Sequence, residues 1–261
     1  MDKLRKHGNP PYRIAFLHGG PGVLKEMGWL AERFSSKHGI LEPLESEITI
    51  DAQVAVFKML FDEQASCPIT LLGYSWGAWL AMIMASRFPD KVNKVILVSS
   101  GGFRESDGKD TLNTRLARLS EVKKEEAYSL MEILGGRKAG DRDEALPRLG
   151  ELFSSLDNFN PMEDNSGEVE VRADIYEGLN KESMDLRKTG KLLEIASKVK
   201  CPVVAIHGDY DSHPADGVRG PLGAVLKDFR FILLEKCGHK PWIEKEAREK
   251  FFEVLDYELM I

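Results

Sequence analysis

The fold of this chain is decided by the stretch Ile69-Thr70-Leu71-Leu72-Gly73-Tyr74-Ser75-Trp76-Gly77. It opens with a short apolar run, and an apolar helical pattern follows it from Ala78 to Ala85. The stretch therefore predicts a strand, a sharp turn and a helix, with Ser75 at the apex of the turn. The glycines two residues before and after the serine tolerate the strained backbone that such a turn requires.

Gly73, Ser75 and Gly77 match the G-x-S-x-G pattern of a nucleophile elbow, which exposes a serine hydroxyl at the end of a sheet and at a helix N-terminus. Three fixed positions of this kind occur by chance in roughly one chain in ten of this length. The interpretation therefore depends on the flanking strand and helix. The alternative is an exposed serine in an ordinary strand-to-helix turn.

Strand and helix patterns alternate on both sides of the elbow. Buried strands are expected at 12–17, 39–41, 92–98, 203–206 and 229–234, and helices from Leu24, after Thr49 or Asp51, at 215–226 and at 242–258. Such alternation is typical of an α/β fold with a parallel sheet and right-handed crossovers. Between 103 and 190 the sequence predicts helices and no convincing strand. We therefore expect a core formed by 1–102 and 191–261, with 103–190 inserted over the sheet as a helical cap.

Composition excludes several classes of protein. The 261 residues are 43% hydrophobic and 30% charged, as is ordinary for a globular protein, and the net charge is −6 without a basic run. Nucleic acid is therefore not an expected partner. The longest apolar stretch is too short to span a membrane, and the charged N-terminus does not resemble a signal peptide. Three widely spaced cysteines (Cys67, Cys201 and Cys237) indicate free thiols, so we expect a cytoplasmic protein with no cofactor and no metal site.

A serine hydroxyl needs a base within hydrogen-bond distance and a third group that orients the base. Active sites of α/β sheets lie at the carboxyl ends of the strands. His239 follows the last predicted strand and begins the last predicted helix, so it is expected to be the base. The alternative for His239 is a solvated loop histidine. Of the other histidines, His207 is expected to be buried and structural, His213 lies near the same edge, and His7 and His38 are expected at the surface.

Three aspartates of the loop at 207–216 compete for the role of the orienting acid. Asp211 is favoured because it lies far enough past the strand to curl over the sheet edge, toward the loop of His239. Asp209 is the main alternative, and Asp216 is expected to cap the following helix.

A tetrahedral intermediate needs two backbone N–H donors. One is expected from Trp76, directly after the serine, and the other from Gly20 in the glycine-rich loop at 18–22. His18 is expected to brace this loop without transferring protons. The alternative for the loop is a flexible turn.

Together, His18-Gly19-Gly20-Pro21-Gly22, Gly73 to Gly77, Asp211 and His239 resemble an α/β-hydrolase fold enzyme over nearly the whole chain apart from the cap. Within that superfamily the motifs are similar to the proline iminopeptidase group, which removes an N-terminal residue, often proline, from peptides and carries a helical cap between the sixth and seventh strands. The resemblance implies Ser75, Asp211 and His239 as the catalytic triad and Gly20 and Trp76 as oxyanion donors. Tyr74 replaces the usual second glycine, and the usual N-terminal antiparallel strands look missing.

Charge in the predicted cap bears on the substrate. Residues 151–185 contain ten acidic and two basic side chains, a local charge of −8. An acidic entrance would attract a cationic substrate such as a free α-amine, whereas the alternative is a solvated acidic face. We therefore predict a serine hydrolase acting on a small ester, amide or short peptide, with an N-terminal aminopeptidase as its sharpest form. The alternatives are a carboxylesterase or lipase-like hydrolase and a ligand-binding protein on the same fold.

Overall fold

The computed structural model describes residues 3–164 and 169–260, and seven of its strands form one sheet in the order β1-β4-β2-β5-β6-β8-β9. The members are β1 (Leu4–His7), β2 (Tyr12–Leu17), β4 (Gly39–Pro43), β5 (Ile69–Tyr74), β6 (Val92–Val98), β8 (Val203–Gly208) and β9 (Phe229–Leu234). All neighbouring strands are parallel except β1, which runs antiparallel to β4. The expected strands are thus confirmed. The expectation that N-terminal antiparallel strands are missing was wrong for one strand, because Leu4–His7 pairs with β4 as β1. The predicted elbow follows β5, at the centre of the sheet.

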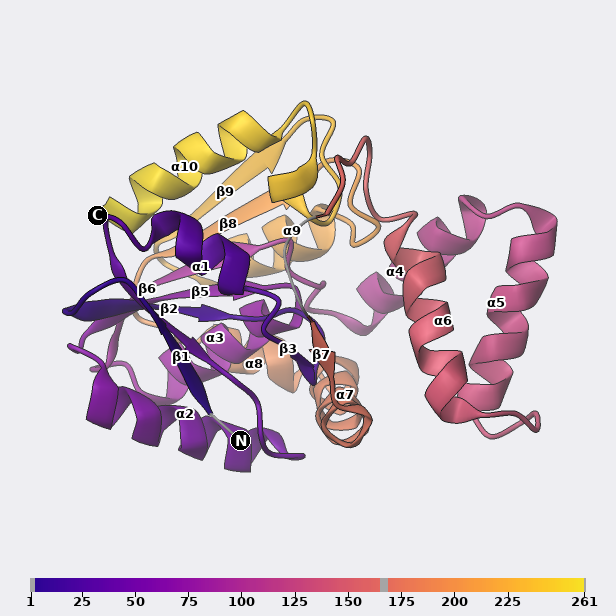
Figure 1. Ribbon diagram of the computed structural model, residues 1–261, viewed down its shortest axis with the longest axis horizontal. Helices are drawn as coiled ribbons and strands as arrows, with labels where there is room; N and C mark the ends of the chain where they lie inside the picture. Colours follow the sequence, from indigo (N-terminus) through magenta and orange to yellow (C-terminus); the bar gives the residue numbers. More distant parts are fainter. Residues whose placement is uncertain (1–2, 165–168, 261) are drawn as a thin grey trace.

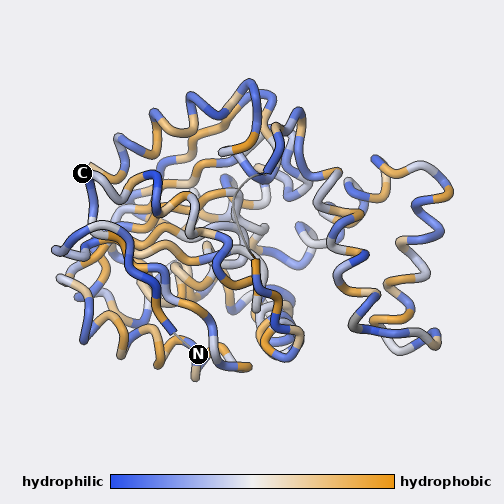
Figure 2. The backbone as a smooth tube through the Cα atoms, in the orientation of Figure 1, coloured by the Kyte–Doolittle hydropathy of each residue, from blue (hydrophilic) through white to orange (hydrophobic). Residues whose placement is uncertain are grey.

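Helices cover both faces of the sheet (Figure 1). On one face lie α1 (Gly28–Phe34) and α10 (Arg248–Met260), and on the other lie α2 (Ile50–Gln64), α3 (Trp76–Arg87), α8 (Lys191–Ala196) and α9 (Asp216–Val225). Hydrophobic residues therefore concentrate in the central strands and on the helix sides that face them (Figure 2). No helix in the described part of the chain is long and apolar enough to cross a membrane.

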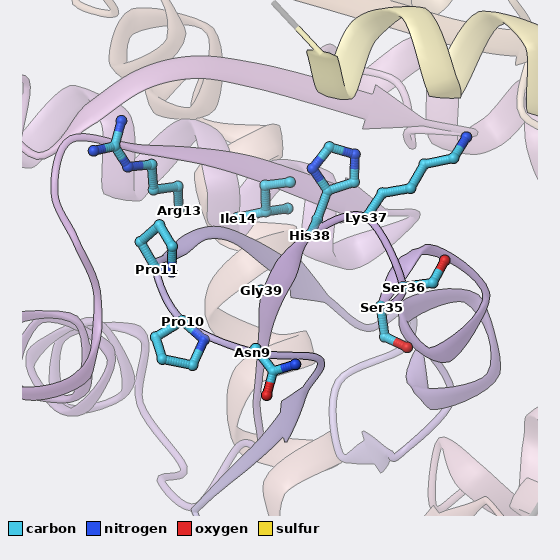
Figure 3. A pocket seen from close by; sticks show the side chains of 10 residues that line it. All are labelled: Asn9, Pro10, Pro11, Arg13, Ile14, Ser35, Ser36, Lys37, His38 and Gly39. Carbon is cyan, nitrogen blue, oxygen red and sulfur yellow. The ribbon is translucent and has the colours of Figure 1, made fainter.

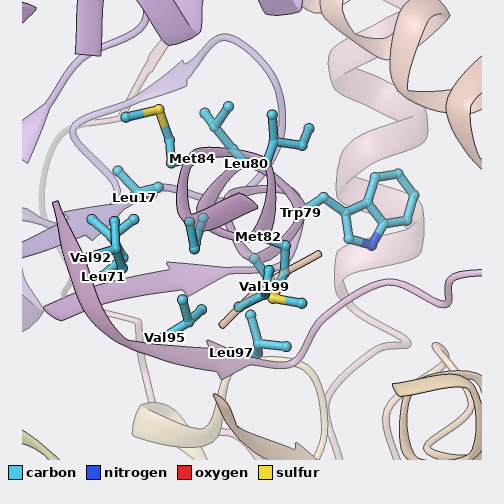
Figure 4. Close-up of a cluster of buried hydrophobic side chains, with 14 of the residues drawn as sticks. Leu17, Leu71, Trp79, Leu80, Met82, Met84, Val92, Val95, Leu97 and Val199 are labelled. Carbon is cyan, nitrogen blue, oxygen red and sulfur yellow. The ribbon is translucent and has the colours of Figure 1, made fainter. Parts of the chain in front are cut away.

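The helix α3 is enclosed by the core, and every residue from Trp76 to Ala85 is buried. A helix that is apolar on all sides is stable only when it is covered on all sides. Its side chains, among them Leu80, Met82 and Met84, pack with residues of the neighbouring strands such as Leu71 and Val95 (Figure 4). This packing holds the N-terminus of α3, and with it Ser75, in a fixed position at the sheet edge.

Four longer helices lie between β6 and β8: α4 (Glu105–Ala117), α5 (Glu121–Leu134), α6 (Arg142–Ser154) and α7 (Ala173–Lys188). The helices α5 and α6 extend away from the sheet and share a small apolar cluster of their own around Leu119, Ala127 and Leu152 (Figure 1). By contrast, α7 packs back on the core through Ile175 and Leu179. The apolar contacts of α7 therefore join this group of helices to the core, and Arg118 after α4 adds hydrogen bonds to the Tyr210 carbonyl and the Ser212 hydroxyl.

Some local predictions were wrong. The helix expected from Leu24 begins only at Gly28, because Val23–Leu24 forms a short strand, β3, that pairs with β7 (Glu170–Val171) inside the region expected to lack strands. The last helix begins at Arg248, after a short 3-10 turn at Pro241–Ile243, so His239 does not open it.

Two predicted caps had different outcomes. Thr49 caps α2, where its hydroxyl accepts a hydrogen bond from the Ala52 N–H at 3.3 Å. Asp216 is instead the first residue of α9, and its carboxylate pairs with Arg219 at 2.7 Å.

The prediction that His7 lies at the surface was also wrong. His7 is buried, and its ring contacts the carboxylates of Glu42 at 2.9 Å and Glu32 at 3.3 Å. Burial lowers the pKa of His7 less than the hydrogen bond to Glu42 raises it, so the net direction is upward.

Candidate active site

Ser75 occupies a strained turn between β5 and α3. Its φ of 52° and ψ of −112° lie outside the regions that most residues adopt, and its N–H donates to the carbonyl of Val98 on β6 at 2.9 Å. A Cβ atom on Gly73 would clash with the carbonyl of Gly77, and one on Gly77 would lie 2.5 Å from the carbonyl of Leu17. Glycine is therefore required on both sides of the serine, as the motif predicts.

The structure brings Ser75, His239 and Asp211 together in a line. The Ser75 Oγ lies 3.1 Å from Nε2 of His239, and Nδ1 of the same ring lies 2.8 Å from Oδ2 of Asp211. Because the carboxylate accepts the Nδ1 proton, Nε2 is left as the acceptor that faces the serine hydroxyl. The three residues follow β5, β9 and β8, whose carboxyl ends lie at one edge of the sheet.

The geometry distinguishes between the competing acids and histidines. Asp209 is exposed, and its carboxylate accepts a hydrogen bond from the Cys237 N–H at 3.1 Å, so Asp211 is the acid beside His239. His207 is fully buried, and its Nε2 donates to the carbonyl of His213 at 2.8 Å. This position agrees with the prediction that His207 is buried and structural.

Electrostatics couples the buried acid to the ring beside it. Burial alone would raise the pKa of Asp211, but the charges and hydrogen bonds of His239 and His213 hold it well below its ordinary range. Burial lowers the pKa of His239, but the charge and hydrogen bond of Asp211 outweigh this and raise it above its usual value. The carboxylate therefore stays ionised and favours a proton on His239.

A second histidine, His213, shares the carboxylate of Asp211. Its backbone N–H and its Nδ1 lie 2.9 Å and 3.0 Å from Oδ1, and its ring stacks on His239 with centroids 4.6 Å apart. Burial lowers the pKa of His213 to about 4, so the ring is neutral at pH 7 and donates its Nδ1 proton. The carboxylate is thus held in place by donors on both oxygens, an arrangement that sequence reasoning did not find.

Gly20 and Trp76, the two predicted oxyanion donors, lie beside the serine. Both line the same small cavity as Ser75. Gly20 has a φ of +53°, which favours glycine, and Trp76 is the first residue of α3, where a backbone N–H has no partner within the helix.

Glu45 connects these two parts of the site. Its buried carboxylate accepts hydrogen bonds from the Trp76 indole at 2.7 Å and from the backbone N–H of Gly22 at 2.6 Å. Nε2 of His18 lies 3.8 Å from the same carboxylate, while Nδ1 donates to the Gly19 carbonyl at 3.0 Å. Sequence reasoning missed Glu45, although its position shortly after the predicted strand at 39–41 places it at the edge where the site residues gather.

The loop after α6 supports the backbone of His239. The backbone N–H of His239 donates to the carbonyl of Asp157 at 2.7 Å, and the Asp157 carboxylate is held by both Nε and Nη2 of Arg115. Lys240 bridges Asp164 at 3.0 Å and Glu26 at 3.5 Å. Acids of the inserted region are therefore engaged with cations around the base.

The cavity beside Ser75 has a volume of about 140 Å³. Its lining consists of Gly20, Pro21, Ser75, Trp76, Trp79, Gly101, Asn180, Ser183, Met184, Arg187 and His213. A separate hollow of about 330 Å³ lies at the amino ends of β2 and β4, between the loop at 9–11 and the loop at 35–39 (Figure 3). None of the predicted site residues lines it, so it belongs to the opposite edge of the sheet.

Asp211, His213 and His239 are also a group of potential metal ligands, with ligand atoms within 4.8 Å of one another. The same atoms form the hydrogen bonds that join the two histidine rings to the carboxylate. A cation held there would displace these bonds, so the arrangement fits proton transfer better than metal binding.

Comparisons with known proteins identify the fold family. The human monoacylglycerol lipase ABHD6 is 22% identical over 250 residues, which cover 94% of this chain and 72% of that protein. The crystal structure of VinJ superposes with a TM-score of 0.73 at 16% identity, covering 98% of this chain and 94% of VinJ. Proline iminopeptidase from Mycobacterium smegmatis gives a TM-score of 0.63 at 16% identity, with coverage of 98% and 93%. Residues 35–246 match the model of the α/β hydrolase fold family, and the chain belongs to that family.

Proposed function

We propose that the protein is a serine hydrolase that cleaves a small ester or amide through an acyl-enzyme. The observation that carries this proposal is the line from Ser75 Oγ to His239 Nε2 at 3.1 Å and from His239 Nδ1 to Asp211 at 2.8 Å. A protein that only binds its ligand has no need of a base aligned between a strained serine and a buried carboxylate.

The proposed mechanism follows from these contacts. Ser75 attacks the substrate carbonyl while His239 takes its proton, and the oxyanion is held by the N–H groups of Gly20 and Trp76. His239 then gives the proton to the leaving group, and Asp211 stabilises the charged ring. Water, activated by the same histidine, releases the acid and restores the serine.

The helices between β6 and β8 are proposed to act as a cap, with 103–190 as the inserted part and 1–102 and 191–261 as the core. The cavity beside Ser75 supports this division, because α7 contributes Asn180, Ser183, Met184 and Arg187 to its lining. Substrate selection would then depend on residues of the insertion rather than on those of the sheet.

An ester is favoured over an N-terminal peptide bond. The similarity to a human monoacylglycerol lipase supports ester cleavage, whereas the proline iminopeptidase likeness is one of fold. Several acids of the insertion are engaged: Asp157 with Arg115, Asp164 with Lys240, and Glu182 with the Ile50 N–H. No carboxylate of the described residues lines the cavity beside Ser75, where an aminopeptidase would need to hold a free amine.

Initial rates on p-nitrophenyl butyrate and proline p-nitroanilide test the proposal, with Ser75→Ala as the paired variant. We expect ester cleavage that falls by roughly three orders of magnitude or more in Ser75→Ala. Fast anilide release that depends on Ser75 would instead indicate an aminopeptidase. Equal ester rates in the two folded proteins would remove Ser75 from the mechanism and favour a binding function.

A further inference from the structure

Arg187 is a cation in the wall of the cavity beside Ser75. It lies in the last turn of α7, and its guanidinium carbon lies 5.4 Å from the centre of the Trp79 ring, another wall residue. Burial lowers the pKa of Arg187, and the charges of Asp107 and Glu105 offset this only in part. The side chain is therefore a partly desolvated charge in the wall of the cavity that contains Ser75.

Within the described chain, no carboxylate forms an ion pair with Arg187. The nearby acid, Asp107, is occupied by Arg104, whose backbone N–H and Nε donate to it at 2.7 Å and 3.3 Å. Nη2 of Arg187 instead contacts the sulfur of Met184 at 2.9 Å. A guanidinium that gives up water without gaining a carboxylate keeps unused donors for an anionic ligand.

Arg187 is also the charged side chain of this cavity. The other ionisable group in the lining, His213, is neutral at pH 7 because burial lowers its pKa to about 4. An amine entering the cavity would meet a like charge, whereas a carboxylate would meet an opposite charge with N–H donors. The cavity wall thus carries a positive charge, whereas residues 151–185 together carry a net charge of −8.

We assign this cavity to the acyl side of the substrate. His239 must protonate the leaving group, yet it does not line the cavity, whereas Ser75 and both proposed oxyanion donors do. At about 140 Å³ the cavity matches the space that a benzene-sized group fills, on the order of six non-hydrogen atoms. A short acyl chain with one terminal anionic group fits this volume.

We propose that Arg187 binds a carboxylate at the far end of a short acyl group, so that the substrate class is the half-esters or half-amides of small dicarboxylic acids. This inference rests on the proposed hydrolase function and names its substrate. Specificity is then set by α7 of the insertion, while the chemistry is set by the loops of the sheet.

The test compares monomethyl succinate with methyl butyrate, which have acyl chains of equal carbon number and the same leaving group. Methanol release is measured for the unmodified protein and for Arg187→Gln, Arg187→Lys and Lys188→Gln. Lys188 follows Arg187 on α7, is exposed and does not line the cavity, so its variant removes the same charge elsewhere. p-Nitrophenyl butyrate reports the uncharged reaction.

We expect kcat/KM to favour monomethyl succinate by about tenfold or more, mainly through KM, as one charge-assisted contact provides. Arg187→Gln should remove this preference, so that the rate on monomethyl succinate falls more than the rate on methyl butyrate, and Arg187→Lys should keep part of it. Lys188→Gln should keep all of it and leave the rate on p-nitrophenyl butyrate within about threefold. Equal rates on both methyl esters, or an equal loss on both in Arg187→Gln, would overturn the proposal.

Binding to Ser75→Ala separates this inference from the hydrolase proposal. Nuclear magnetic resonance titrations of Ser75→Ala and of Ser75→Ala with Arg187→Gln need no turnover. Tighter binding of monomethyl succinate that is lost with Arg187→Gln supports the anion site even if no ester is cleaved. Equal affinity for the two esters in Ser75→Ala would reject the anion site even if p-nitrophenyl butyrate is hydrolysed.

Discussion

The indole of Trp76 donates a 2.7 Å hydrogen bond to the buried carboxylate of Glu45, whose other oxygen accepts the N–H of Gly22 at 2.6 Å. One side chain therefore joins the first turn of α3 to the loop that carries Gly20. The two proposed oxyanion donors come from elements that are far apart in the sequence, and Glu45 sets their relative position.

Replacing Glu45 by Gln is expected to lower kcat by about 10- to 100-fold on p-nitrophenyl butyrate with little change in KM. A glutamine offers one oxygen and one NH₂ group, so one of the two donors loses its acceptor and the oxyanion loop shifts. Glu47→Gln is the control, because Glu47 is partly exposed and its carboxylate pairs only with Lys3 and Ser46 among the described residues. An unchanged kcat in Glu45→Gln would show that the loop holds its shape without this carboxylate.

Asp211→Asn is expected to lower kcat by about 10⁴-fold, because the amide cannot hold His239 in the tautomer that accepts the serine proton. The matched variant Asp209→Asn should remain active. Among the described residues, the Asp209 carboxylate accepts a hydrogen bond only from the Cys237 N–H. Steady-state rates on one ester distinguish the two acids. Comparable losses in both variants would contradict the assignment of Asp211.

The pH dependence of kcat/KM should report His239. The base must be neutral to accept a proton, so activity falls as pH decreases through its folded pKa, which Asp211 raises above the usual 6.5. We expect an acid limb with a midpoint above 6.5, and a shift of this limb to lower pH in the residual activity of Asp211→Asn. His213, with a pKa of about 4, does not contribute to this limb. A midpoint below 6.5 in the unmodified protein would be inconsistent with the raised pKa.

Gly77→Ala is expected to destabilise the fold by roughly 1–3 kcal/mol, because its Cβ would lie 2.5 Å from the carbonyl of Leu17 in the neighbouring strand. Gly150→Ala in α6 provides the opposite case, since no group outside its own helix backbone and chain neighbours lies within 4 Å of the added atom and alanine stabilises a helix relative to glycine by about 1 kcal/mol. Urea unfolding measures both. A Gly77→Ala protein as stable as the parent would mean that the elbow relaxes without cost.

Local patterns in the chain were sufficient to predict the α/β sheet, the elbow and the loops that carry Ser75, Asp211 and His239. A parallel sheet aligns the carboxyl ends of its strands, so side chains that follow separate strands meet at one edge whatever the loop details. The preference for Asp211 over Asp209 came from its distance past the strand end, and the structure places Asp211 beside the base.

The same local reading failed where the partner is distant in the sequence. His7 looked exposed because its neighbours in the chain are polar, yet the pairing of β1 with β4 buries it against Glu42. The short strand β3 was missed because its partner, β7, lies within the inserted region.

Only the tertiary structure decided how the site residues are held in place and which charged side chain lines the cavity beside Ser75. The bond from Trp76 to Glu45, the sharing of Asp211 by two histidines and the position of Arg187 all depend on side-chain directions across separate elements. The spacing of residues along the chain specifies which edge of the sheet a side chain reaches, because the repeat of a strand or helix depends only on neighbouring residues. Packing between elements specifies which partner that side chain meets, since the partner is brought near by folding and not by the chain.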